Sequence, residues 1–195
     1  MTTIATEVSP SKWTIASPTF GPRKDKFSKL SVQGSPIMIQ LCASDVALKA
    51  PFGVSSFGDE NHTRVNLALA VQDESLKAWA HSIDEWAIKE LCKDSERLLS
   101  NSRLTEVEVR GMYKPLLMEK DNYPPILKMK MNLNHVRCWN SERERVTTEE
   151  IDWKQYRFTP MFIFSKMWYM NNCCGLTLEV TDLIIHHPVA SCPFV

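Results

Sequence analysis

The hydrophobic residues of the segment 64–71 fall at every second position. They are Val65, Leu67, Leu69 and Val71. Successive side chains of a strand point to opposite faces, so this alternation predicts a strand that buries one face. Runs of β-forming residues at 28–33 and 36–42 predict two earlier strands, which a Gly-Ser-Pro turn separates.

The segment 126–133 alternates in the same way and carries lysines on its polar face. Its hydrophobic positions share the other face and are Leu127, Met129, Met131 and Leu133. A strand in this register buries those four side chains and leaves Lys128 and Lys130 exposed on one face. Both lysines can then follow a single track across the surface.

The period of the pattern changes between Asp73 and Leu99, where hydrophobic residues recur at helical spacing. They are Leu76, Trp79, Ile83, Trp86, Ala87, Leu91 and Leu98. Asp73 is a suitable N-cap, and the acidic Glu74 favours the first turn of a helix. We predict one long helix, broken near Lys93-Asp94, with both tryptophans facing the core.

Strands return after this helix. We predict them at 106–110, 126–133, 156–170 and 176–186, with a polar loop or helical turn at 141–152. The last two form a hairpin, because the Asn and Gly residues of 171–175 favour a turn between them. Strands that alternate with turns disfavour a doubly wound α/β fold. The pattern favours a mostly β fold, a small closed or partly open barrel with one inserted helix; a β-sandwich is the alternative.

Length and composition are those of one ordinary domain. The chain has 195 residues, of which 44% are hydrophobic and 24% charged, and this suffices for a hydrophobic core. No run reaches the about 18 apolar residues of a membrane-spanning helix, and the N-terminal segment lacks the apolar region of a secretory signal. We therefore expect a protein that is not secreted and has no membrane partner, with its six cysteines as thiols.

The two ends of the chain differ from the middle. Pro10, Pro18 and Pro22 break any helix in residues 1–27. We expect a loosely structured N-terminal arm, part of which lies on the domain surface because it contains Trp13 and Phe20. Residues 28–187 then form the domain, and residues 188–195 form a C-terminal tail.

Motifs of the common enzyme classes are absent from the sequence. It has no G-x-x-x-x-G-K-[ST] loop, no G-x-G-x-x-G fingerprint, no G-x-S-x-G elbow and no H-E-x-x-H motif. Paired acids at 142/144 and 149/150 lie in the most polar stretch, where a solvated loop explains them. We expect a protein that is not an enzyme and that holds no cofactor.

Cysteine and histidine residues gather at the two ends of the last predicted strand. Cys173 and Cys174 precede it, and His186, His187 and Cys192 end or follow it. Zinc accepts ligands of both types. However, adjacent residues of a strand point to opposite faces, and the strand separates the two groups. We expect ordinary thiols and no metal site.

Charge is balanced over the whole chain, with 23 basic and 23 acidic residues, but it is unevenly distributed. Residues 101–140 carry seven basic and four acidic residues, among them Arg110, Lys114, Lys120 and the two lysines of 126–133. Proteins that bind single strands combine such basic tracks with aromatic platforms for the bases. Aromatic candidates on nearby strands are Trp139, Tyr156, Phe158, Trp168 and Tyr169.

Each of these residues also has an ordinary structural explanation. A lysine can simply lie on the solvent-exposed face of a strand, and an aromatic ring can belong to the hydrophobic core. Their co-occurrence nevertheless favours nucleic-acid binding. The candidate contact residues are Lys128, Lys130, Arg110, Lys114, Trp139, Tyr156, Phe158 and Trp168. Basic residues of the N-terminal arm are the next candidates: Arg23, Lys24, Lys26 and Lys29.

Six segments between residues 36 and 187 carry further information. They are APFGVSSFG at 50–58, VNLAL at 65–69, IDE at 83–85, YPP at 123–125, FIFSKMWY at 162–169 and CGLTLEV at 174–180. Together they resemble a family of OB-fold single-stranded-DNA-binding proteins of large nucleocytoplasmic DNA viruses and related algal proteins, and the similarity spans roughly residues 36–187.

The resemblance implies an OB-like five-stranded barrel with an inserted helix, which binds single-stranded DNA without sequence preference. It implies a role in DNA replication, repair or recombination, in the nucleus or at a viral replication site in the cytoplasm. RNA binding and homo-oligomers stay open. The final residues, HPVASCPFV, differ from the acidic tails of many replication proteins. The alternative is a viral structural or assembly protein that self-associates through a β barrel or sandwich.

Overall fold

The computed structural model describes residues 3–22, 25–43, 46–56, 63–99 and 103–187. Within these ranges, none of the helices combines the length and the apolar character needed to cross a membrane. The C-terminal tail predicted at 188–195 lies outside the described residues. So do Arg23 and Lys24 of the N-terminal arm.

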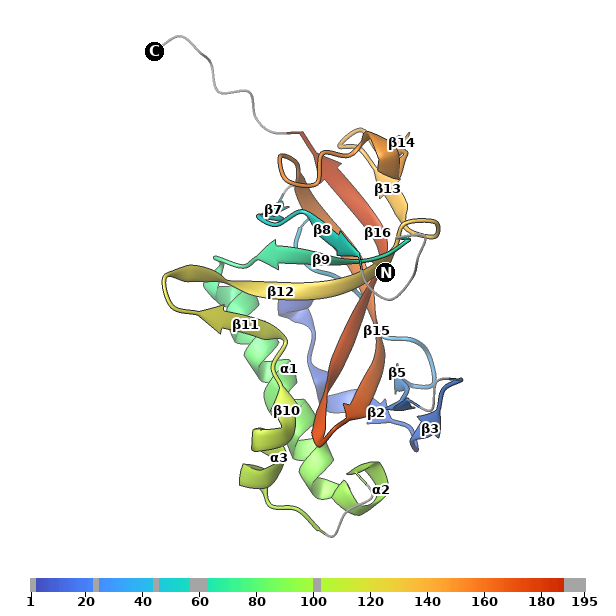
Figure 1. The fold of residues 1–195 in the computed structure, drawn as a ribbon, viewed down its shortest axis with the longest axis vertical. Helices are drawn as coiled ribbons and strands as arrows, with labels where there is room; N and C mark the ends of the chain where they lie inside the picture. The colour runs from blue at the N-terminus through green and yellow to red at the C-terminus, as the bar shows by residue number, and fades with distance from the viewer. Residues whose placement is uncertain (1–2, 23–24, 44–45, 57–62, 100–102, 188–195) are drawn as a thin grey trace.

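One large curved sheet organises the described residues (Figure 1). Its main path runs β1-β6-β15-β16-β12-β9-β8. The bounds of these strands are β1 Thr3–Ile4, β6 Met38–Gln40, β15 Arg157–Met170, β16 Cys173–His186, β12 Tyr123–Asn132, β9 Arg64–Ala70 and β8 Val54–Ser56. This architecture confirms the predicted mostly β fold with an inserted helix.

Shorter strands attach to this path. They are β3 Thr19–Phe20, β4 Lys26–Ser28, β7 Leu48–Lys49, β10 Tyr113–Lys114, β11 Leu117–Lys120, β13 Arg137–Trp139 and β14 Arg145–Val146. A separate two-stranded sheet pairs β2, Trp13–Ile15, with β5, Leu30–Val32. The predicted strand at 28–33 is therefore two strands, β4 and β5, which belong to different sheets.

The hairpin of β15 and β16 is the longest pairing in the molecule, and it confirms the predicted hairpin. Asn171 and Asn172 connect the strands with φ of 49° and 56°. Positive φ at both central residues is typical of the turns that join tightly twisted strands, and asparagine tolerates it. β16 begins at Cys173, three residues before the predicted start.

The register of β12 against β9 confirms both predicted alternations. Leu127 pairs with Leu69 and Met129 with Leu67, and all four side chains are buried. Lys128 and Lys130 are exposed, as the period of two predicts. Leu133 is only partly buried, because β12 ends one residue before it.

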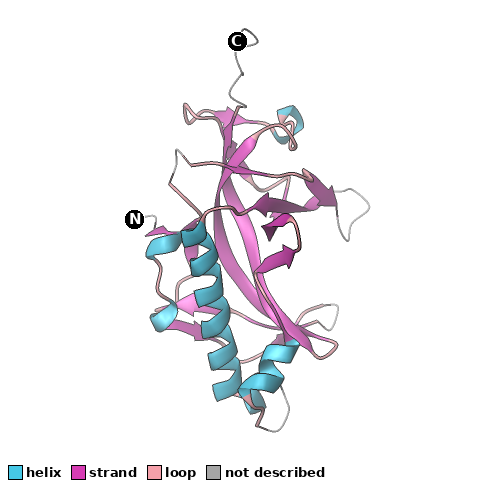
Figure 2. Ribbon diagram, turned by 90° about the vertical axis from the view of Figure 1, so that its left-hand side faces the viewer, coloured by secondary structure: helices cyan, strands magenta, loops and turns pink. Residues whose placement is uncertain are grey.

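Helix α1, Glu74–Lys93, packs along the sheet (Figure 2). Its predicted N-cap is confirmed, since Asp73 Oδ1 accepts a hydrogen bond of 2.9 Å from the backbone N–H of Leu76. The predicted break is also confirmed, because Asp94 separates α1 from α2, Ser95–Leu99. Trp79 is 5% exposed and packs against Phe162 and Phe164.

The predicted strand at 106–110 is wrong, because this segment forms helix α3, Glu106–Met112. The side chain of Thr105 accepts a hydrogen bond from the backbone N–H of Glu108, and the carboxylate of Glu108 accepts one from the backbone N–H of Thr105. This reciprocal pair satisfies donors at the helix start. An alternation over only five residues was too short to distinguish a strand from a helix.

The N-terminal arm is more ordered than the sequence predicts. Its described residues contain β1, β2, β3 and two 3-10 helices, Ala5–Glu7 and Pro10–Lys12. Trp13 is buried, with its ring 5.3 Å from that of Trp86 and 4.8 Å from that of Phe164. A third 3-10 helix, Thr148–Glu150, lies in the polar stretch where we predicted a loop or a helical turn.

Candidate nucleic-acid interface

A groove of about 1040 Å³ lies where β10 and β12 both pair with β16. β10 pairs with Cys174 and Gly175, and β12 pairs with Glu179. The residues of β16 between these pairings, 176–178, line the groove. Segments from α1, α3, β11 and β15 complete its walls. We call it the lysine groove, because five of its lining residues are Lys26, Lys114, Lys128, Lys130 and Lys166.

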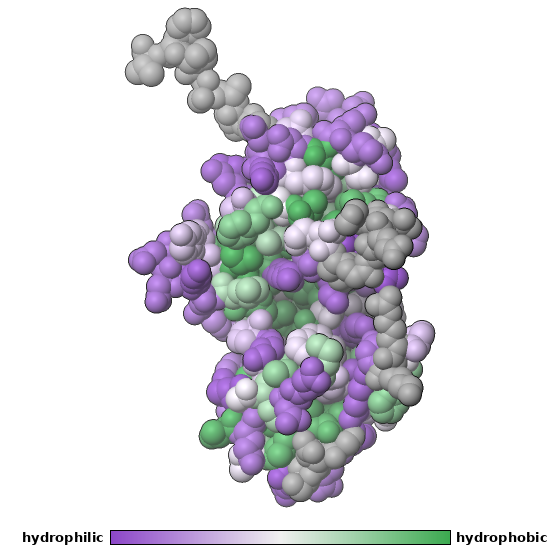
Figure 3. Space-filling model, in the orientation of Figure 1, coloured by the Kyte–Doolittle hydropathy of each residue, from purple (hydrophilic) through white to green (hydrophobic). Residues whose placement is uncertain are grey.

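Five of the eight predicted contact residues line this groove. They are Lys128, Lys130, Arg110, Lys114 and Trp168. In the space-filling view, hydrophobic side chains gather around the middle of the face seen in Figure 1, with hydrophilic side chains around them (Figure 3). A groove lined by lysines and by apolar side chains suits a ligand that has both anionic groups and flat rings.

Positive charges crowd around Lys130. Although Lys130 as a whole residue is exposed, partial burial of its ammonium group lowers the pKa of that group. The nearby charges of Lys166, Lys128 and Arg64 lower the pKa further, while Glu179 acts in the opposite direction. An anion bound here would relieve that repulsion. The floor of the groove is therefore electrostatically prepared for a phosphate.

A register shift in β15 brings Lys166 and Trp168 to the groove. Phe164 pairs with Leu178, but Lys166 pairs with Thr177, so Ser165 is an extra residue. The extra residue reverses which side chains point inward: Phe164 is buried before it and Met167 after it. Sequence reasoning missed Lys166, since a simple alternation across residues 156–170 places it on the core face.

The indole of Trp168 lies against Gly175 on the neighbouring strand. A Cβ atom at Gly175 would come within 2.9 Å of Trp168 Cζ2 and 3.2 Å of the Lys114 carbonyl oxygen. Only glycine leaves room for the ring at this position. Trp168 is half-buried and lines the groove, so it is the best placed of the predicted aromatics to stack on a base.

Lys26 and Lys166 are held in place by aromatic and acidic neighbours. Lys26 Nζ lies 5.4 Å from the ring centre of Tyr169, and burial lowers its pKa. Lys166 Nζ lies 4.9 Å from the ring centre of Phe27 and forms an ion pair of 3.4 Å with Asp25. These contacts fix two ammonium groups at the rim of the groove.

Arg110 belongs to the groove wall, but its charge is offset. Its Nη2 donates to Glu85 and to Glu106, each at 2.8 Å. Both carboxylates raise the pKa of the guanidinium group. Arg110 thus ties α3 to α1, and we place less weight on it as a phosphate ligand than on Lys128 or Lys130.

Three predicted aromatics lie outside the lysine groove. Phe158 is 0% exposed, and its ring stacks on that of Trp153 with the ring centres 5.4 Å apart. It is a core residue, so the prediction that it is a platform for a base is wrong. Tyr156 packs edge-on against His187 at 4.8 Å. Trp139 lines a separate pocket beside β13.

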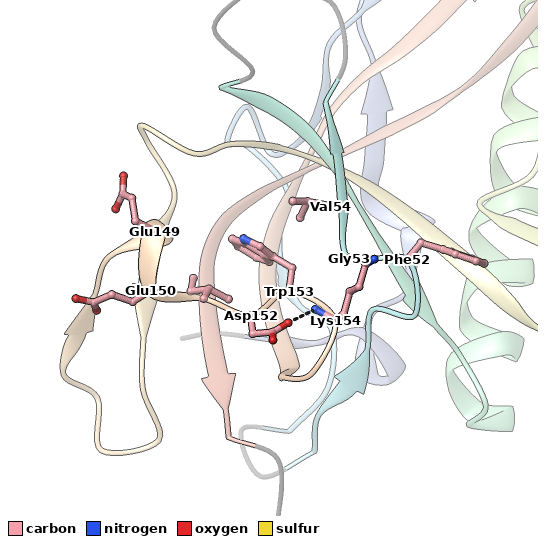
Figure 4. Close-up of a pocket in the computed structure, with 9 residues that line it drawn as sticks. Phe52, Gly53, Val54, Glu149, Glu150, Asp152, Trp153 and Lys154 are labelled. Carbon is pink, nitrogen blue, oxygen red and sulfur yellow. Dashed lines mark hydrogen bonds between the residues drawn. The ribbon is translucent and has the colours of Figure 1, made fainter.

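A further pocket, of about 560 Å³, lies between the loop at Phe52 and residues 149–154 (Figure 4). Figure 4 shows the carboxylates of Glu149 and Glu150 pointing outward from its rim. Asp152 Oδ1 accepts a hydrogen bond of 3.1 Å from the backbone N–H of Lys154. The lining of this pocket has three carboxylates and a single lysine, so its charge balance is negative and disfavours a phosphate backbone.

The residues considered for zinc are separated by the fold. Cys173 and Cys174 start β16 and His186 ends it, thirteen positions from Cys173. Burial raises the pKa of Cys174 to about 12, which disfavours the thiolate that a metal needs. Within the described ranges, no three His, Cys, Asp or Glu residues form a group that could hold a metal ion. Cys192 lies outside those ranges.

The fold is similar to that of two phage proteins. One is the single-stranded DNA-binding protein from bacteriophage Enc34, with a TM-score of 0.50 and 11% identity over 93% of each chain. The other is gp2.5, a single-stranded DNA binding protein encoded by bacteriophage T7, with a TM-score of 0.51 and 8% identity over 81% of this chain and 90% of that chain. No protein-family model and no curated protein sequence matches this chain. At these identities the similarity shows a shared fold.

Proposed function

We propose that this protein binds single-stranded DNA without sequence preference, as a non-enzymatic factor in DNA replication, repair or recombination. The observation that carries the proposal is the convergence of five lysines and Trp168 on one groove in a chain of zero net charge. These residues come from four separate strands: β4, β10, β12 and β15. The shared fold with two phage proteins that are named for this activity supports it.

The mechanism combines phosphate neutralisation with stacking. Lys128 and Lys130, two residues apart on β12, follow one backbone track along the groove floor. Trp168 offers a π-face to any base, so binding tolerates all sequences. Released counterions make the affinity depend on salt, with a log–log slope near −0.7 for each phosphate neutralised on a single strand.

The sequence resemblance extends this proposal to the protein's origin and place of action. It relates the chain to the binding proteins of large nucleocytoplasmic DNA viruses and their algal relatives. A protein with this role acts on exposed strands in the nucleus or at a viral replication site in the cytoplasm. The proposed contacts of the lysine groove are to phosphates and base faces, which RNA also carries, so RNA is the alternative ligand.

A fluorescence anisotropy titration tests the proposal. A labelled oligothymidine of about 30 nucleotides, longer than the about 16 nucleotides that one OB fold covers, is titrated at several salt concentrations. We expect saturable binding that weakens steeply with salt. Absence of binding at low salt would contradict the proposal, and oligomers in size-exclusion chromatography would then favour the assembly alternative. An RNA strand of equal length measures the preference for DNA.

A further inference from the structure

A second group of cations and one aromatic residue lie on the hairpin of β13 and β14 and on its turn. Arg137, Arg143 and Arg145 are all exposed. Trp139, which lies between Arg137 and Arg143 in the sequence, is half-buried. A pocket of about 450 Å³ opens beside this hairpin, lined in part by Arg137, Trp139 and Arg143. None of these residues lines the lysine groove.

The carboxylate of Asp182 fixes the positions of Arg137 and Trp139 in this site. Asp182 Oδ2 accepts a hydrogen bond of 2.7 Å from Arg137 Nη2, and Asp182 Oδ1 accepts one of 3.3 Å from Trp139 Nε1. The Asp182 side chain is only 14% exposed. The edge of the indole is therefore fixed, and the guanidinium group of Arg145 lies 4.9 Å from the ring centre. Trp139 is positioned before any ligand arrives.

The turn that presents Arg143 is also internally bonded. Asn140 Oδ1 accepts hydrogen bonds from the backbone N–H groups of Glu142 and Glu144, at 3.0 and 2.8 Å. The carboxylate of Glu144 accepts a bond from Asn140 Nδ2 at 3.0 Å, so it is engaged within the turn. Arg143 itself has a φ of 66°, a conformation that the turn maintains.

We propose that this hairpin is a second contact site for the same DNA strand, with Trp139 against a base and Arg143 and Arg145 on phosphates. The inference rests on the proposed function. A planar guanidinium group binds phosphate through paired hydrogen bonds and also stacks on flat rings. An indole with one arginine over its ring and another lining the same pocket therefore suits a nucleotide better than it suits an isolated anion.

The two sites lie on one face of the sheet. Leu178, Val180 and Leu183 of β16 are buried, and a register shift separates the last two. Thr177, Glu179 and Asp182 consequently share the outer face. Thr177 lines the lysine groove and Asp182 lines the hairpin pocket, about 17 Å apart at the usual rise of a strand. A strand of several nucleotides can span both sites, passing Lys130 and its neighbour Glu179.

The test compares two oligothymidines, one of about 5 nucleotides that fills a single site and one of about 30 nucleotides. The variant Arg143→Gln/Arg145→Gln removes two exposed hairpin charges. Lys12→Gln/Arg103→Gln removes two exposed charges that line neither pocket and serves as the control. Lys128→Gln/Lys130→Gln reports on the groove. Circular dichroism verifies that each variant is folded.

We expect the hairpin variant to bind the long strand more weakly than the wild type does, with a log–log salt slope reduced by about 1.4 for two lost phosphates. Because the lysine groove is intact in this variant, the affinity for the short strand should fall less than the affinity for the long strand. The control should match the wild type with both strands. If the hairpin variant equals the control on the long strand while the groove variant is impaired, the second site is refuted and the proposed function stands. If the wild type binds neither strand, the proposed function itself fails.

Discussion

The buried carboxylate of Asp84 on α1 accepts a hydrogen bond of 2.7 Å from the hydroxyl of Tyr113 on β10. The same carboxylate accepts from the backbone N–H of Leu116 at 3.1 Å. Asp84 is 6% exposed. These bonds fasten the segment that carries Lys114 to the long helix, so Asp84 and the pairing of β10 with β16 together position one wall of the groove.

Protonation of Asp84 should be visible in the pH dependence of stability. Burial raises its pKa to about 6, although the bonds from Tyr113 and Leu116 favour the carboxylate. The folded state then holds a proton that the unfolded chain, with an ordinary pKa of 3.8, releases. This stabilisation is present below about pH 4 and is lost as the pH rises through 6.

The variant Asp84→Asn cannot titrate, and it isolates this effect. The free energy of unfolding of the wild type, minus that of the variant, should fall by about 3 kcal/mol between pH 3 and pH 8, of which about 2 kcal/mol is lost between pH 4 and pH 6. Urea unfolding at a series of pH values measures both curves. Other carboxylates with lowered pKa values, such as Asp73, are present in both proteins, so their contributions cancel in this difference. A flat difference would show that Asp84 is not buried as described.

Gly175→Ala should weaken DNA binding through Trp168. The added methyl group would lie 2.9 Å from the indole, and a backbone oxygen on its other side limits relief, so the ring must move. We expect a loss similar to that of Trp168→Ala, about 1–3 kcal/mol of binding free energy, with an unchanged salt slope. Anisotropy titrations measure both quantities. A reduced slope would point to displaced lysines instead of a displaced ring.

Trp79 and Trp86 should differ in their contribution to stability. Trp79 is 5% exposed, and alanine there should cost about 3–5 kcal/mol. Trp86 is half-buried and packs edge-on against Trp13, so Trp86→Ala should cost less. Chemical unfolding of the two variants tests the order. An equal or larger loss at position 86 would mean that the N-terminal segment covers this helix more fully than described.

Thr105→Ala should destabilise α3. The variant removes the hydroxyl that accepts from the backbone N–H of Glu108, at an expected cost of about 1 kcal/mol. Thr105→Ser retains that hydroxyl and is the matched control. Because α3 leads directly into β10, amide hydrogen exchange at Tyr113 and Lys114 should also accelerate in the alanine variant. Unchanged exchange at these two residues would show that the helix cap does not stabilise the groove wall.

Local patterns were sufficient to predict the parts of the interface that depend on one strand. The alternation of β12 alone places Lys128 and Lys130 on the outer face, because a period of two has only one register that buries Met129 and Met131. Helical spacing and the Asp73 cap likewise define α1. In both cases the signal extends over enough residues to exclude the other period.

Features that depend on irregular or distant pairing could not be predicted in this way. The extra residue at Ser165 reverses the alternation of β15 and moves Lys166 to the groove. β13 pairs with β16 across more than forty residues, which separates Trp139 from the lysines. Asp84 meets Tyr113 only in the folded chain. The T-x-x-E spacing of Thr105 and Glu108 is a capping-box signature in the sequence. It indicates a helix at 106–110, where the alternation predicted a strand.

The salt dependence of binding by Lys128→Gln/Lys130→Gln tests the central claim most directly. Both side chains are exposed, so the variant should fold, and Lys12→Gln/Arg103→Gln again controls for net charge. If the lysine groove is the DNA track, the log–log slope for the long oligothymidine falls by about 1.4, since two phosphate contacts are lost. An affinity and slope equal to those of the control variant would contradict the account.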